Sequence, residues 1–189
     1  MTSRIEDVAA DLLARADGRT RFVVAIAGPP GAGKSTFVDD LSKVLVRQGA
    51  SAAIVPMEGF HLDDAVLRER GLLTRKGAPE TFDVRGLLDI VRAIRSAQEE
   101  VFVPLFDRSR ELAVAAARAV APESRIVLLE GNYLLLDQHP WRLLSGLVDC
   151  SIMLMPSTDI LEERLMQRWL GLGMPEAEAR AKVMENDLP

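Results

Sequence analysis

The sequence has almost no cysteine, which rules out one class of protein at once. Cys150 is the only cysteine among 189 residues. A single cysteine forms no disulfide within the chain, and this is typical of proteins kept in a reducing cytoplasm. Cys150 lies in the apolar segment 148–154, so we expect a buried and unreactive thiol. The composition therefore excludes a disulfide-stabilised scaffold.

Positive charge and long apolar stretches are also scarce. The chain has 23 lysines and arginines against 28 aspartates and glutamates, a net charge of −5. A general nucleic-acid binder normally needs a basic face, so no nucleic-acid partner is expected. No apolar stretch is long enough to span a bilayer, and the first residues do not resemble a signal peptide. We expect a cytoplasmic protein without a membrane partner, in which local donors hold any anionic ligand.

What the sequence does contain is a regular alternation of apolar runs and segments with helical spacing. With 48 % hydrophobic residues and no internal repeat or linker, residues 1–189 suit one α/β domain. The predicted strands are 21–27, 52–56, 101–106, 126–129 and 150–155. The predicted helices are 5–18, 36–45, 65–70, 82–94, 158–170 and 175–186, while the Ala-rich segment 113–121 is left unassigned. Continuous apolar strands alternating with helices predict a parallel sheet covered on both faces.

A phosphate-binding loop is the most specific motif. The run 28–36 fits G-x-x-x-x-G-K-[ST], with a β-rich apolar run before it and a helical pattern after it. Its backbone N–H groups and the start of the following helix would surround an anion, which predicts a nucleoside triphosphate with Mg²⁺. The alternative is an ordinary Gly/Pro-rich turn. The residues predicted to bind the phosphates are Gly28, Pro29, Pro30, Gly31, Ala32, Gly33, Lys34, Ser35 and Thr36.

Two glutamates stand at the ends of predicted strands, where ligands of parallel sheets collect. Glu130 follows four apolar residues, and we expect it to hold the metal together with the Ser35 hydroxyl. A glutamate that caps a neighbouring loop is the alternative. Glu58 lies in a turn beside Gly59 and is a candidate base for a hydroxyl proton. The alternatives for Glu58 are a water-orienting residue of a hydrolase and a solvated turn residue.

Other polar residues lie in loops that face the same edge. His61 and Asp63 follow Gly59 and are candidates for substrate binding, although Asp63 also suits a helix cap. Asp107 and Arg108 follow another strand and suit a clamp for a polyol or an anionic substrate. A weak surface ion pair is the alternative.

Two arginines late in the chain share a helix face. Arg164 and Arg168 are one turn apart, on a helix that ends at glycine. This placement suits a mobile lid, over about 157–186, whose arginines close on the phosphates. Solvated helix charges are the alternative.

Six segments, in this order, resemble one family of P-loop kinases. They are 28–36, 57–64, 75–83, 104–108, 130–136 and 186–189. The family is the uridine kinase/phosphoribulokinase/pantothenate kinase group, and within it the chain looks most like bacterial fructose-transport-system kinases, which are fructokinase-like. The runs Lys-Gly-Ala-Pro-Glu-Thr-Phe-Asp and Glu-Gly-Asn-Tyr-Leu-Leu-Leu carry most of this resemblance.

The resemblance implies a three-layer αβα P-loop NTPase fold with a five-stranded parallel sheet and a helical lid. It also implies an ATP-dependent kinase that uses Mg²⁺ and phosphorylates a small-molecule hydroxyl, with a sugar such as fructose as acceptor. A nucleoside or pantothenate acceptor is the alternative within the class, and a regulatory NTPase is the alternative outside it. The protein could act as a homodimer under any of these alternatives.

The resemblance further assigns roles by motif position. Glu58 would be the catalytic base beside Lys34, although the family usually has Asp where this chain has Glu58. Glu130 would serve the metal site, and Arg164 and Arg168 the lid. Relatives continue beyond 186–189 into an edge strand. The residues that would line the acceptor pocket are His61, Lys76, Asp83, Asp107 and Arg108.

Overall fold

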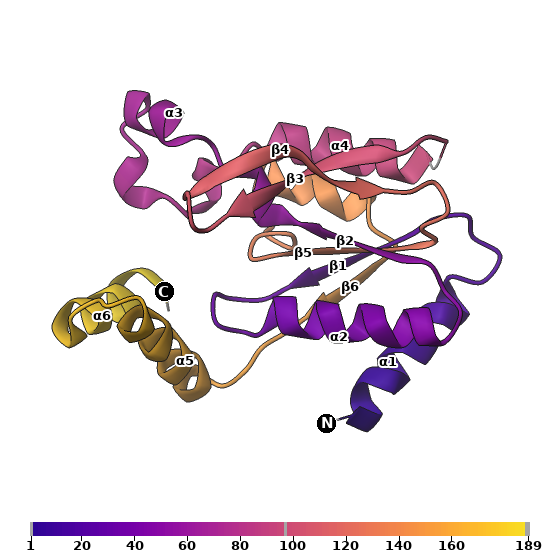
Figure 1. Cartoon of the computed structure of the whole chain (residues 1–189), viewed down its shortest axis with the longest axis horizontal. Helices are drawn as coiled ribbons and strands as arrows, with labels where there is room; N and C mark the ends of the chain where they lie inside the picture. The colour runs from indigo at the N-terminus through magenta and orange to yellow at the C-terminus, as the bar shows by residue number, and fades with distance from the viewer. Residues whose placement is uncertain (1, 97, 188–189) are drawn as a thin grey trace.

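A parallel sheet with helices on both faces forms the framework of the protein (Figure 1). The computed structural model describes residues 2–96 and 98–187. The strands lie in the order β2 (Ala52–Pro56), β5 (Ile126–Gly131), β1 (Phe22–Ala27) and β6 (Cys150–Met153). Each neighbouring pair is parallel. The predicted α/β class with a parallel sheet is confirmed.

The alternating side chains of β1 divide the core into two halves. Val24 and Ile26 are buried in a cluster with the apolar faces of α1 (Thr2–Arg15) and α2 (Lys34–Arg47). Val23 and Ala25 point into the other cluster, which includes α4 (Val84–Ser96). Burial on both faces explains why the strand reads as one continuous apolar run. In Figure 1, α1 and α2 lie below the sheet and α4 lies above it.

The predicted count of five parallel strands is wrong for the described residues. The run that begins at Val101 forms β3 (Val101–Asp107), which pairs antiparallel with β4 (Leu112–Val120) in a separate two-stranded sheet. The chain reverses between these strands within four residues, because Asp107 accepts hydrogen bonds from the backbone N–H groups of Ser109 and Arg110. A turn this short permits only an antiparallel partner. The unassigned Ala-rich segment is thus the second strand of a hairpin.

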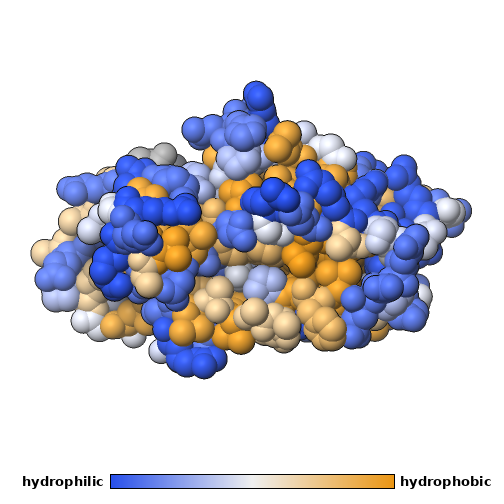
Figure 2. Space-filling model, turned by 90° about the horizontal axis from the view of Figure 1, so that it is seen from above, coloured by the Kyte–Doolittle hydropathy of each residue, from blue (hydrophilic) through white to orange (hydrophobic). Residues whose placement is uncertain are grey.

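The hairpin covers one half of the core while its outer side remains open to solvent. Val103 and Val120 are fully buried, whereas the side chain of Phe102 is 54 % exposed. Figure 2, seen from above the view of Figure 1, shows hydrophobic surface lying between groups of hydrophilic residues. β4 therefore lacks the continuous burial of the strands in the main sheet.

The other helices are short or come late in the chain. They are η1 (Met57–Phe60), α3 (Asp64–Glu69), η2 (Leu73–Arg75), η3 (Pro79–Thr81), η4 (Trp141–Gly146), α5 (Thr158–Gly171), α6 (Glu176–Lys182) and a π-helical turn, η5 (Val183–Asp187). The helix predicted from residue 82 begins at Val84, because the Asp83 carboxylate caps it at the N–H of Gly86. Within the described residues, no helix is long and apolar enough to cross a membrane. Residues 188–189, part of the last resembling segment, lie outside this description.

One close backbone contact fixes η1 against the hairpin. A Cβ placed on Gly59 would lie 2.2 Å from the carbonyl oxygen of Pro104 in β3. Only glycine permits this approach. The turn that carries Glu58 is therefore supported by the hairpin as well as by β2.

We expect Gly59→Ala to destabilise the protein by about 1–3 kcal/mol, because the added methyl group must displace backbone atoms rather than a flexible side chain. Urea denaturation measures the change in the free energy of unfolding. Gly146→Ala is the matched control, since a Cβ there meets no atom within 4 Å. Equal stability of the two variants would contradict the proposed support of η1.

Candidate active site

The phosphate-binding loop connects β1 to α2, as the motif predicts. Gly31 and Gly33 have φ angles of 78° and 86°, in the left-handed region that favours glycine. α2 begins at Lys34, directly after this bend. The first N–H groups of the helix and its positive dipole end therefore face the loop, an arrangement that favours an anion.

Lys34 turns back onto the loop. Its Nζ donates hydrogen bonds to the carbonyl oxygens of Gly28 and Pro29, both at 2.9 Å. Burial lowers the pKa of Lys34 from its ordinary value of 10.5 to about 8, although the negative charges of Glu130 and Glu58 act in the opposite direction. The ammonium group is thus poorly solvated in the free protein, and an incoming phosphate would improve its surroundings.

Ser35 and Glu130 form the neighbouring pair. The Ser35 hydroxyl lies 3.3 Å and 3.2 Å from the two carboxylate oxygens of Glu130. Burial raises the pKa of Glu130, while the hydrogen bond from Ser35 and the charge of Lys34 lower it. The sheet register sets Pro56 beside Glu130, so the ends of β2 and β5 lie at the same edge.

A hydroxyl and a half-buried carboxylate are the hard oxygen donors that suit Mg²⁺. Among residues 2–96 and 98–187, no group of three or more His, Cys, Asp or Glu side chains could hold a metal alone. Mg²⁺ normally keeps several waters and takes phosphate oxygens as further ligands, so two protein ligands are compatible with it. Ser35 and Glu130 fit the predicted metal role.

Glu58 lies across the same edge, on η1. Its Oε2 accepts a hydrogen bond from the guanidinium of Arg108, which follows β3. Glu58 acts electrostatically on both Lys34 and Glu130, so the carboxylates from two strand ends share one field. The structure brings the candidate base and the candidate clamp residue into direct contact.

His61 is held within an aromatic group. Its ring centroid lies 4.1 Å from that of Phe82 and 4.8 Å from that of Phe106. Burial lowers the pKa of His61, so the imidazole is neutral at pH 7. Its Nδ1 lies 2.9 Å from the carbonyl oxygen of Glu58, and since a carbonyl only accepts, Nδ1 carries the proton.

Lys76 reaches the same aromatic group from the loop after α3. Its Nζ lies 5.4 Å from the ring centroid of Phe106 and donates to Asp64 at 2.6 Å and to the carbonyl oxygen of Glu111 at 2.8 Å. The Lys76 side chain is 18 % exposed. The partners of Lys76 carry no sequence signal, because one is the first residue of α3 and the other lies in the hairpin turn.

Three predicted site aspartates are engaged in local hydrogen bonds. Asp63 caps α3 by accepting from the N–H of Ala65 at 2.8 Å, and Asp83 caps α4. Asp107 holds the hairpin turn, where hydrogen bonds from Ser109 and Arg110 keep the pKa of its carboxyl well below the usual range. These bonds give each carboxylate a structural role, and contact with a substrate stays a prediction.

The predicted lid arginines approach the loop from α5. Arg164 donates to the carbonyl oxygens of Gly31 and Ala32 at 3.2 Å and 3.4 Å. Leu165 packs at Gly31, where an added Cβ would lie 3.2 Å from its Cγ. The Arg168 guanidinium lies 5.2 Å from the ring centroid of Trp169, and its charge contributes to the lowered pKa of Lys34.

The sequence model of the Phosphoribulokinase / Uridine kinase family matches residues 23–170, a span that contains the loop, both glutamates and the arginines of α5. The chain belongs to this family. The similar proteins are kinases, so the chain is a P-loop phosphotransferase that acts on the hydroxyl of a small molecule.

Three similar proteins of the phosphoribulokinase/uridine kinase type are named for different acceptors. The crystal structure of a candidate fructose transport system kinase from Silicibacter sp. TM1040 has a TM-score of 0.93 and 47 % identity, covering 97 % of this chain and 90 % of its own. A candidate uridine kinase of Schizosaccharomyces pombe is 34 % identical and covers 89 % of this chain and 75 % of its own. The pantothenate kinase of Leifsonia xyli subsp. xyli is also 34 % identical, over 69 % of this chain and 41 % of its own.

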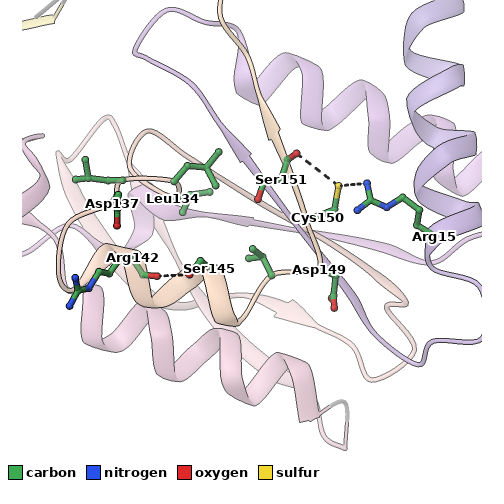
Figure 3. Close-up of a pocket in the computed structure, with 11 residues that line it drawn as sticks. Arg15, Leu134, Asp137, Arg142, Ser145, Asp149, Cys150 and Ser151 are labelled. Atoms are coloured by element: carbon green, nitrogen blue, oxygen red, sulfur yellow. Dashed lines mark hydrogen bonds between the residues drawn. The ribbon is translucent and has the colours of Figure 1, made fainter.

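A hollow of about 400 Å³ lies elsewhere, beside the edge strand β6 (Figure 3). Arg15 donates there to the sulfur of Cys150 at 3.0 Å, and the predicted burial of this thiol is confirmed. None of the predicted site residues lines this hollow. In a family that binds phosphates at the loop, the hollow is separate from the chemistry.

The pH dependence of stability tests the burial of Lys34. Between about pH 8 and pH 10.5 the unfolded chain keeps a proton that folded Lys34 has lost, so the free energy of unfolding gains a term that rises with pH. Below pH 8, Lys34 is charged in both the folded and the unfolded chain, so burial of the ammonium lowers the free energy of unfolding by its full amount. We expect the stability advantage of Lys34→Met over the wild type to be largest at pH 7. It should shrink above pH 8 by at most about 1.4 kcal/mol per pH unit.

Urea denaturation of the ligand-free proteins at pH 7, 8, 9 and 10 measures this difference. Lys43→Met, which removes an exposed lysine of the same helix, controls for the loss of a side chain. A difference between wild type and Lys34→Met that stays constant over this range would show that the ammonium is not destabilised by burial.

Proposed function

We propose that the protein transfers the γ-phosphoryl group of ATP to a hydroxyl of a sugar or sugar-like polyol, of which fructose is one, with Mg²⁺ as cofactor. The observation that carries this proposal is the convergence of Lys34, the Ser35–Glu130 pair and Glu58 at one edge of the sheet. Membership of a kinase family supports the reaction type. The similarity to the Silicibacter protein supports the acceptor class.

Phosphate binding falls to the loop. Backbone N–H groups of residues 31–35 would surround the β- and γ-phosphates, and Lys34 would exchange its two carbonyl partners for phosphate oxygens. Ser35 and Glu130 would hold Mg²⁺, which neutralises charge on the phosphates when it is bound. Catalysis of this kind is mainly positioning and neutralisation of charge.

The acceptor hydroxyl would be activated at Glu58. As the hydroxyl oxygen forms a bond to the γ-phosphorus, the bond from that phosphorus to the bridging oxygen breaks and ADP leaves. The hydroxyl proton passes to the Glu58 carboxylate. Arg108 contacts this carboxylate, His61 contacts the backbone carbonyl of Glu58, and Lys76 lies over the ring of Phe106. These three side chains would line the acceptor pocket.

The α5–α6 segment would act as the lid. Arg164 already contacts the loop through its carbonyl oxygens, and Arg168 lies close enough to act on the charge of Lys34. Closure of α5 would bring both guanidinium groups onto the transferred phosphate and exclude water, which otherwise competes with the acceptor.

The aromatic surroundings favour a sugar-like acceptor over a nucleoside. A nucleoside base needs an aromatic face on which to stack. The ring of Phe106 is instead flanked by Lys76 and Arg108, at 5.4 Å and 5.9 Å from its centroid, and by His61. A small polar acceptor fits these surroundings better.

ADP release measured across a panel of sugars, sugar acids and nucleosides tests the proposal. We expect turnover that depends on an acceptor, and a loss of at least about 10²-fold in Lys34→Ala, because the phosphates lose their ammonium partner. Circular dichroism checks that the variant is folded. Turnover that is slow and unaffected by any acceptor would instead indicate a regulatory NTPase.

We expect Glu58→Gln to reduce phosphoryl transfer by about 10²- to 10⁴-fold while ATP binding is retained, since an amide cannot take up the hydroxyl proton. Single-turnover transfer and calorimetric ATP binding measure the two effects. Glu100→Gln, which makes the same change at an exposed position before β3, is the control. Unchanged transfer in Glu58→Gln would remove this residue from the base role.

A further inference from the structure

In the free protein, the carboxylate proposed as the base is already occupied. Arg108 donates from Nη2 to Oε2 of Glu58, an oxygen that a substrate hydroxyl would need. A hydrogen-bonded ion pair and proton transfer from a hydroxyl compete for the same lone pairs. The acceptor must therefore displace Arg108 or bind beside it.

Three hydrogen-bonded acid–base pairs involve Glu58 or residues predicted for the acceptor pocket, and they differ in how easily they can exchange. Asp107–Arg110 is a local pair that also holds the hairpin turn. Asp64–Lys76 joins a lysine that is only 18 % exposed and that has a further carbonyl partner.

The third pair is as exposed as the first, at 56 % and 34 % for Arg108 and Glu58 against 61 % and 28 % for Arg110 and Asp107, but it joins two separate elements instead of holding a turn. Exposed pairs contribute little to stability and exchange partners readily. Arg108 is therefore a cation that an incoming ligand can recruit without disturbing the hairpin turn, and it is the one bonded to Glu58.

A neutral acceptor that displaces Arg108 from Glu58 offers the guanidinium no new anionic partner. Freeing Glu58 would leave the guanidinium without a carboxylate, and His61 is neutral and supplies no charge. A carboxylate or phosphate on the acceptor would take both N–H donors of the Arg108 fork and release Glu58 in the same step. The exchange keeps every charge paired.

We infer that Arg108 selects acceptors that carry a carboxylate or phosphate group near the reactive hydroxyl, and that binding of this anion uncovers Glu58. The inference rests on the proposed function and narrows its acceptor class from polyols in general to anionic ones. Arg108 is a specificity-determining and positioning residue in this scheme, since it acts through Glu58 and not on the transferred phosphate.

The test compares matched acceptors that differ only in the anionic group. Suitable pairs are D-glycerate and glycerol, gluconate and glucitol, pantothenate and pantothenyl alcohol, and fructose 6-phosphate and fructose. Because the pairs include both carboxylates and a phosphate, the comparison also shows which of these two anionic groups Arg108 prefers. Binding is measured by calorimetry in the presence of a non-hydrolysable ATP analogue and Mg²⁺, and turnover by ADP release.

We expect at least one anionic member to bind about 10- to 100-fold more tightly than its neutral partner, in line with the strength of a charge-assisted hydrogen bond. Arg108→Gln should abolish this preference, mainly through KM for the anionic member, and Arg108→Lys should restore part of it. Arg110→Gln, which removes the same charge two residues away, should leave the preference in place.

The outcomes separate the inference from the proposed function. Turnover with equal preference for neutral and anionic members keeps the kinase and overturns the role of Arg108. Binding of an anion that depends on Arg108, without phosphoryl transfer to any member, supports the inference and contradicts the proposed function. Failure of every anionic member to bind, or an equal loss of ATP-analogue affinity in Arg108→Gln, overturns the inference.

Discussion

The site depends on an ammonium group placed where it is poorly solvated. Lys34 is bonded to two loop carbonyls rather than to an anion, and its lowered pKa reflects the cost of that burial. The nearby carboxylate of Glu130 is also destabilised by burial. Two opposite charges lie near each other, and each is poorly solvated. In the proposed function they would form a preorganised receptor for a phosphate chain and its cation.

The parallel sheet brings these charges together. Because β1, β2 and β5 run in the same direction, residues far apart in sequence meet at one edge without long loops. The N-terminus of α2 follows the loop directly, and α5, which comes later in the chain, contacts the same loop through Arg164. The donor side is thus built mainly from main-chain geometry, and the acceptor side from side chains that converge from η1, the loop after α3 and the hairpin.

Sequence patterns predicted the elements around the phosphate-binding loop, but they did not predict the hairpin or the ion pairs near Glu58 and Lys76, for a physical reason. The loop, its flanking strand and helix, and the strand-end position of Glu130 follow from local spacing, and the structure bears them out. The hairpin was missed because an Ala-rich strand with an exposed face has no clear periodicity. The ion pairs of Glu58 with Arg108 and of Lys76 with Asp64 join separate loops, so no local pattern encodes them. Asp107 has a further role that its polar position did not indicate, because its carboxylate also holds the hairpin turn.

The hairpin contacts the turn that carries Glu58 where Gly59 meets the backbone of Pro104 and where Arg108 pairs with Glu58. It shares no strand pairing with the main sheet in the described part of the chain. Sequence drift in β3 and β4 can therefore remodel the pocket wall while the nucleotide half stays untouched. A scaffold divided in this way lends itself to diversification. The sheet and the phosphate-binding loop can stay constant while the hairpin changes to accept different substrates.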